Sequence, residues 1–280
     1  MTIEQAIVLA IIQGLTEFLP VSSSGHLVLI SWLFDWPDQG IAFDAAIHLG
    51  TLGAVLIYFR AIWMALIRGV IKGGMVRVSY VHSDSLEFSA RRMTVFLLIG
   101  TVPVAICGFF VGGNKTLIDF FRQPEIVGGV FIVTGAVLTI GEIIGRKTRG
   151  LPEITHLDSF KIGLAQVLAL IPGISRSGMT IATGMIANLS REASATFSFL
   201  LCVPVIAGSG LFLLIDAAWS LNYSAQQWWV VLMGVCISFI TGYLAIGGLM
   251  KLLTRSSLKP FIAYIFFVGI AVIIARMFGL

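Results

Sequence analysis

Two short polar stretches in a mostly apolar chain hold most of the side chains that could do chemistry. The first, at residues 20–26, has the sequence PVSSSGH, and the second, at residues 172–180, has the sequence PGISRSGMT. Shifting the first by 153 positions aligns Gln13 with Gln166, Ser22 with Ser175, Ser24 with Ser177 and Gly25 with Gly178. Serine hydroxyls and glycine-rich backbone at helix starts offer hydrogen-bond donors, which favours the binding of an anion such as phosphate.

Arg176, inside the second stretch, is the most informative single residue. At bilayer depth an arginine costs about 2.5 kcal/mol or more unless it is paired. Its planar guanidinium can hold two phosphate oxygens at once, so we expect it to bind a phosphate group. The alternative is a structural ion pair with Glu17, and the two roles could alternate as substrate comes and goes.

Glu17 is the only acid in the first polar region, and it could serve as a metal ligand or a proton carrier. Gln13 lies four residues earlier and therefore on the same helix face. His26, just inside a helix start, could act as a nucleophile or as a general acid or base near neutral pH. Asp44 and His48, one helical turn apart on the first predicted span, are secondary candidates. For each of them the alternative is a purely structural hydrogen bond.

The composition predicts the elements that must position these residues. The chain is 58% hydrophobic and 11% charged, whereas soluble proteins are roughly 45–50% apolar and about 25% charged. Several apolar runs reach ~20 residues, the length that crosses the hydrocarbon core. We therefore expect an all-α polytopic membrane protein. The net charge of +4 is explained by orientation in the membrane rather than by binding of nucleic acid.

The polar stretches predict two re-entrant hairpins, at residues 2–36 and 161–188. As one continuous helix, about 35 residues would be ~52 Å long, which exceeds the ~30 Å hydrocarbon core. When the helix is split at the polar break, each half is too short to span. Irregular backbone at that depth is tolerated only where protein shields it or where it lines a wet cavity.

Six full spans complete the predicted single membrane domain of residues 1–280. They are expected at 42–60 with an interfacial extension to Arg68, 93–112, 125–145, 193–216, 228–250 and 259–279. Residues 69–90 are expected to form a polar loop and residues 146–161 a basic loop.

The distribution of Lys and Arg supports re-entry of both hairpins. With six spans, 14 basic residues share one side and three, Lys115, Arg122 and Arg276, lie opposite. If the second hairpin crossed the membrane instead, the count would be 11 against six. The positive-inside rule favours the first arrangement, which places both termini outside the cytoplasm.

The two hairpins are separated by three spans, so they are expected to enter the bilayer from opposite faces. Residues 1–146 and 159–280 are then inverted repeats whose polar turns meet near the midplane. Two facing helix N-termini would form a cradle for an anion. The expected substrate-binding residues are Gln13, Ser22, Ser24, Gly25, Ser175, Ser177, Gly178 and Thr180. The alternative is that these serines only cap helices.

The Gln13-x-x-x-Glu17 spacing and both polar stretches closely resemble the undecaprenyl-diphosphate phosphatases of the bacitracin-resistance type, from about residue 4 to the C-terminus. The resemblance implies a hydrolase of the bacterial plasma membrane. Such an enzyme removes the terminal phosphate of undecaprenyl diphosphate, recycles the lipid carrier for cell-wall synthesis and confers bacitracin resistance.

The resemblance also assigns roles. It makes Glu17 a metal ligand or acid/base, Ser23 and His26 candidates for nucleophile or proton carrier, and Arg176 the residue that grips the diphosphate. Ser175, Ser177 and Thr180 would be supporting donors. The attacking group is left open between His26, Ser23 and water.

The family depends on a divalent cation such as Mg²⁺ or Ca²⁺, and this chain departs from the family pattern at one relevant position. Position 13 is Gln, where the resemblance leads us to expect Glu. One of two carboxylates for a metal is therefore missing, although Glu17 and diphosphate oxygens could still hold the ion.

A competing function is transport. Inverted repeats with facing broken helices are also a transporter plan, so the protein could be a transporter or flippase of the lipid carrier or of an anion. In both cases the expected partners are the lipid substrate and membrane lipids, without nucleic acid, and a homo-oligomer is left open.

Overall fold

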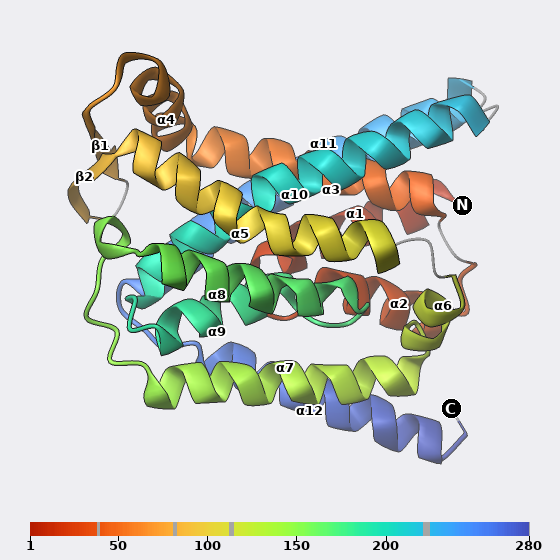
Figure 1. Ribbon diagram of the computed structural model, residues 1–280. Coiled ribbons are helices and arrows are strands. Elements are labelled where there is room, and N and C mark those ends of the chain that lie inside the picture. Colours follow the sequence, from red (N-terminus) through yellow and green to blue (C-terminus); the bar gives the residue numbers. More distant parts are fainter. Residues whose placement is uncertain (38–39, 81–82, 112–114, 221–224, 280) are drawn as a thin grey trace.

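The computed structural model describes residues 1–37, 40–80, 83–111, 115–220 and 225–279, and helices make up most of this part of the chain (Figure 1). The helices are α1 (Ile3–Phe18), α2 (Ser23–Leu33), α3 (Ile41–Tyr58), α4 (Arg60–Lys72), α5 (Ala90–Val111), α6 (Lys115–Phe121), α7 (Pro124–Ile144), α8 (His156–Val167), α9 (Arg176–Ile186), α10 (Arg191–Ser220), α11 (Ala225–Leu253) and α12 (Lys259–Met277), with short 3₁₀ turns at Leu151–Glu153 and Leu168–Leu170.

Within the described residues, five helices are long and apolar enough to cross a membrane: α5, α7, α10, α11 and α12. Helices α3 and α4 bend by 75° relative to each other and supply a sixth span if the pair is counted as one. Phe59 lies at this bend, close to the predicted end of the first span. The chain is therefore a multi-pass membrane protein, as its composition predicts.

The first helical hairpin consists of α1 and α2. Helix α1 starts at a capping box between Thr2 and Gln5 and stops before Pro20, which lacks the N–H that a helix would need. Helix α2 starts at its N-cap Ser22, which has a φ of 72°. At 1.5 Å per residue the two helices are about 24 and 16 Å long. The break is narrower than predicted, because Ser23 already belongs to α2.

The second helical hairpin consists of α8 and α9 and begins earlier than the predicted residue 161. The side chain of Thr155 accepts a hydrogen bond from the backbone N–H of Asp158 at 3.2 Å, and the two form a capping box that starts α8 at His156. Gly173, with a φ of 93°, and the N-cap Ser175 shape the turn before α9.

The prediction that residues 69–90 form only a polar loop is wrong. Strands β1 (Met75–Tyr80) and β2 (Ser83–Ser89) pair antiparallel, and Val76 lies opposite Phe88. The apolar side chains alternate with Arg77, which bonds Glu87 across the strands at 3.0 Å. Val78 and Phe88 are buried against the helices. The fold is therefore all-α except for this one two-stranded sheet among the described residues.

The two helical hairpins lie inside the bundle. Helix α1 packs along α11 and α3, α8 packs along α5, and α9 lies against α7 and α10. Helices α7 and α12 run side by side at one edge. Both chain termini lie at one end of the molecule and the β-hairpin at the other (Figure 1).

Gly128 allows the close approach of α7 and α12. A Cβ atom on Gly128 would lie 2.9 Å from the Gly269 carbonyl oxygen, whereas a Cβ on Gly129 would meet nothing within 4 Å. We expect Gly128→Val to lower the melting temperature of the purified protein, because overpacking typically costs about 1–3 kcal/mol. Gly129→Val is the matched control and should leave it unchanged. Equal melting temperatures for the two variants would contradict close packing at this contact.

Candidate active site

The turns of the two helical hairpins touch each other, as the sequence predicts. The backbone N–H of Gly173 donates to Ser24 Oγ at 3.2 Å. The Ser177 hydroxyl donates to the Leu19 carbonyl oxygen at 2.9 Å. These bonds join segments about 150 residues apart in sequence, and they hold the starts of α2 and α9 against each other.

A cavity of about 160 Å³ lies where the turns meet, and we call it the Glu17 cavity. Its walls are formed by Glu17, Ser22, Ser23, Ser24, His48, Ala169, Ile174, Ser175, Arg176 and Ser177. Seven of these are residues that the sequence predicts for the site. One guanidinium and five hydroxyl groups therefore surround one carboxylate.

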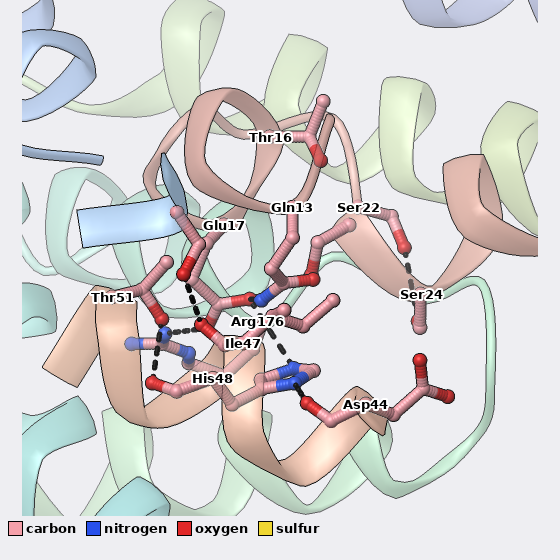
Figure 2. A network of polar contacts seen from close by, with 12 residues as sticks. Gln13, Thr16, Glu17, Ser22, Ser24, Asp44, Ile47, His48, Thr51 and Arg176 are labelled. Atoms are coloured by element: carbon pink, nitrogen blue, oxygen red, sulfur yellow. Dashed lines mark hydrogen bonds and ion pairs between the residues drawn. The ribbon is translucent and has the colours of Figure 1, made fainter. Parts of the chain in front are cut away.

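Glu17 is the centre of the polar network (Figure 2). Its Oε1 accepts a hydrogen bond from Arg176 Nη2 at 2.6 Å. Its Oε2 accepts from the Ser23 hydroxyl at 2.6 Å and from Gln13 Nε2 at 2.9 Å. The ion pair with Arg176, expected as one of two roles for that arginine, is thus present. Because the carboxylate is buried, these donors take the place of solvent around it.

Arg176 is the first residue of α9, and two further residues hold it in place. Its Nη1 donates to the Ser198 carbonyl oxygen at 3.4 Å. The Thr180 hydroxyl donates to the Arg176 carbonyl oxygen at 2.8 Å and also bonds the Ser198 hydroxyl at 2.7 Å. Thr180 is completely buried behind Arg176. It therefore positions the arginine and does not line the Glu17 cavity.

The two predicted glycines serve the helix starts. Gly25 donates its N–H to the Ser22 hydroxyl oxygen at 3.3 Å, and Gly178 donates to Ser175 at 3.0 Å. The capping role that the sequence left as an alternative is therefore present. Capping uses only the acceptor side of each hydroxyl. Each N-cap hydroxyl also contacts a second serine, Ser22 with Ser24 at 3.4 Å and Ser175 with Ser177 at 3.2 Å. A Cβ atom on Gly25 would overlap the Phe131 ring, so glycine is needed for packing against α7.

His26 does not line the Glu17 cavity. Its Nδ1 lies 2.6 Å from the Ser22 carbonyl oxygen, and its Nε2 lies 2.8 Å from the Tyr264 hydroxyl. The imidazole stacks on the Tyr264 ring with an interplanar angle of 7°. These contacts turn the ring toward α12, so its direct effect is to hold the backbone at the start of α2.

The histidine that lines the cavity is His48 on α3, which the sequence marks only as a secondary candidate. Its Nδ1 lies 2.7 Å from the Asp44 carbonyl oxygen, and its Nε2 lies 3.6 Å from Glu17 Oε2 (Figure 2). The Asp44–His48 spacing was the only sequence signal for this position. Ile174 lies within the second polar stretch without being a candidate itself, whereas Ser198 carries no sequence signal, and only the fold brings it to the site.

The residues around Glu17 do not fit a divalent cation held by the protein alone. Both carboxylate oxygens already accept hydrogen bonds from Arg176, Ser23 and Gln13. Among the described residues no group of three His, Cys, Asp or Glu side chains could hold a metal. Mg²⁺ and Ca²⁺ need about six or more oxygen ligands. Gln13 donates its Nε2–H to Glu17, which leaves Gln13 Oε1, buried without a hydrogen-bond partner, as one neutral oxygen in place of a second carboxylate.

Comparison with known proteins identifies the family of this chain. A family model described as bacitracin resistance protein BacA matches residues 6–271. The chain is 40% identical over 288 residues to an undecaprenyl-diphosphatase of Thermomicrobium roseum and 41% identical over 282 residues to one of Pelotomaculum thermopropionicum, with 100% of each chain covered. It is 40% identical over 266 residues to one of Alteromonas mediterranea, which covers 94% of this chain and 95% of the relative. The protein therefore belongs to the BacA family.

Proposed function

We propose that this protein is an integral membrane phosphatase that hydrolyses undecaprenyl diphosphate to undecaprenyl phosphate and inorganic phosphate. This reaction recycles the lipid carrier for cell-wall synthesis and confers bacitracin resistance. The observation that carries the proposal is a polar cavity, with Arg176, Glu17 and five serines in its walls, inside a bundle of apolar helices. A substrate with a diphosphate head and a long isoprenoid tail fits both surroundings. The names of the relatives support the same substrate.

Arg176 is proposed to grip the terminal phosphate. Its guanidinium now donates to Glu17 Oε1 at 2.6 Å, and the same N–H groups can donate to phosphate oxygens when the diphosphate enters. Hydrogen bonds between a guanidinium and phosphate are strong because both groups are charged. They stabilise the negative charge that moves to the leaving oxygen as the P–O bond breaks.

Ser23 is proposed as the nucleophile and Glu17 as its base. The Ser23 hydroxyl already donates to Glu17 Oε2 at 2.6 Å. In the proposed step this proton moves to Glu17, Ser23 Oγ bonds the terminal phosphorus, and the bond to the bridging oxygen breaks. Water then hydrolyses the phosphoserine, which releases phosphate and restores the hydroxyl. His26 is a positioning residue in this scheme, because it contacts the Ser22 carbonyl and not the cavity.

The membrane path is also part of the proposal. We infer six spans and two re-entrant hairpins, in which residues 1–146 and 159–280 form inverted repeats. The paired packing of α1 with α11 and of α8 with α5 supports such a repeat. The shared end of both termini (Figure 1) and the excess of Lys and Arg in the opposite loops favour termini outside the cytoplasm of a bacterial plasma membrane.

The decisive experiment is phosphate release from undecaprenyl diphosphate by purified protein in detergent, where no gradient exists. We expect release that stops with a chelator and returns with Mg²⁺ or Ca²⁺, because a cation bound to the diphosphate would enter with the substrate. Release that a chelator does not affect would remove the cation from the proposal. Failure to release phosphate under any condition would refute the enzyme and favour a transporter or flippase.

A further inference from the structure

A second cavity adjoins the Glu17 cavity. It has a volume of about 230 Å³, and Ser24, His48 and Ala169 line both cavities. The remaining walls are formed by Leu27, Val28, Asp44, Arg122, Leu170 and Pro172. We call it the Arg122 cavity. The two cavities are therefore neighbours, with these three shared side chains between them.

The walls of the Arg122 cavity combine a cation with apolar surface. Arg122 directly follows α6, near the end of the molecule where both termini lie (Figure 1). Leu27 and Val28 come from the first helical hairpin, and Leu170 and Pro172 come from the second. A free phosphate ion gains nothing from apolar walls, whereas a phosphate ester of an isoprenoid uses both the guanidinium and the apolar surface.

We propose that the Arg122 cavity binds a polyprenyl monophosphate group, meaning the lipid-linked phosphate and the first isoprene units of the substrate. This inference rests on the proposed function and adds a second phosphate subsite to it. Arg176 holds the terminal phosphate in the Glu17 cavity, and Arg122 holds the phosphate that stays on the lipid. After cleavage the monophosphate product remains on Arg122, while inorganic phosphate leaves from Arg176.

Asp44 provides a test of the subsite, because its negative charge should affect phosphate binding in the direction opposite to Arg122. Its carboxylate lines the same cavity and lies in the first turn of α3, where the helix dipole favours a negative charge. A bound phosphate is attracted by Arg122 and repelled by Asp44. Removing one charge or the other should therefore shift affinity for a polyprenyl monophosphate in opposite directions.

The experiment measures binding of farnesyl monophosphate, a short polyprenyl phosphate, to the purified full-length protein. Arg122→Gln should raise its Kd about tenfold, since a hydrogen bond to a charged group contributes that much or more. Asp44→Asn should lower the Kd. Arg276→Gln is the matched control and should change nothing, because Arg276 pairs with exposed Glu125 and lies outside the cavity. The Kd of inorganic phosphate should stay the same in all three variants.

An unchanged Kd of farnesyl monophosphate in Arg122→Gln would overturn the subsite. Equal weakening of inorganic phosphate would also overturn it, because the site would then hold the free ion. If Arg122→Gln fails to fold, as judged by size-exclusion chromatography, Arg122→Lys and Asp44→Asn decide the matter through shifts of opposite sign. Since binding is measured without turnover, a protein that binds farnesyl monophosphate but releases no phosphate would refute the enzyme and leave the subsite standing.

Discussion

Arg176→Lys is expected to lower kcat for phosphate release about 100- to 1000-fold, the usual loss when a preorganised donor to a developing charge is removed. Lysine keeps the positive charge, but it loses the planar fork that now reaches Glu17 Oε1 and the Ser198 carbonyl oxygen. Steady-state phosphate release from undecaprenyl diphosphate in detergent would measure the change.

Arg191→Lys is the matched control for that variant. Arg191 also makes a two-point contact, through Nε and Nη2 to Glu142 at 2.8 and 2.6 Å, but it lies outside the Glu17 cavity. Its replacement should affect stability more than kcat. Near-normal turnover in Arg176→Lys, or equal losses of kcat in the two variants, would defeat the assignment of Arg176 to the phosphate.

Ser23→Ala is expected to lower kcat about 1000-fold or more, because it removes the proposed nucleophile. Ser24→Ala, the adjacent residue in the same wall, should lower it less than about tenfold, because Ser24 supplies one hydrogen bond. Phosphate release under substrate saturation would compare the two. Similar losses in both variants would mean that Ser23, like Ser24, only binds the diphosphate and is not the nucleophile.

Acid quenching during turnover of substrate labelled in its terminal phosphate would identify the attacking atom. We expect a labelled peptide that contains phosphoserine at Ser23, since this hydroxyl bonds Glu17 at 2.6 Å inside the cavity. Label on His26 would show that the imidazole leaves Tyr264 and attacks directly. Full turnover without any labelled peptide would favour attack by water.

The sequence predicts the helical hairpins and their contact well, because the signals there are local. Proline stops, serine caps and glycines that admit close packing act within a few residues, so the breaks before α2 and α9 can be read directly. Glu17 and Arg176 are identified because a charge in an apolar run needs a partner. The ion pair between them, which the sequence left as an alternative role for Arg176, is present at 2.6 Å.

The remaining features depend on neighbours that are distant in sequence. The direction in which the His26 side chain points is set by Tyr264, which is 238 residues away in sequence. His48 reaches the site because α3 packs beside α1. The β-hairpin was missed because its alternation, Val76 and Val78 around Arg77, is short and lies in a polar region. A binding role for Arg122 can be inferred only from the cavity that it lines, because the walls of that cavity come from both helical hairpins.

Gln13 is a neutral hydrogen-bond donor to the buried carboxylate of Glu17. Its Nε2 donates to Glu17 Oε2 at 2.9 Å, so the amide stabilises the ionised carboxylate. A second carboxylate at this distance would place two negative charges beside one guanidinium, which is unfavourable at low dielectric. Because the Gln13 amide is neutral, the single negative charge of Glu17 faces the single positive charge of Arg176.

The separation of Glu17 and Arg176 by 159 residues also constrains how the protein is made. The ribosome delivers Glu17 to the membrane well before its cationic partner has been translated. An isolated carboxylate in hydrocarbon is strongly disfavoured in its charged form. The nascent first half must therefore keep this side chain protonated or bound to Gln13 and Ser23 until α9, in the second half of the chain, arrives. Formation of the ion pair is thus a late step in biogenesis, and it marks the moment when the two halves have docked.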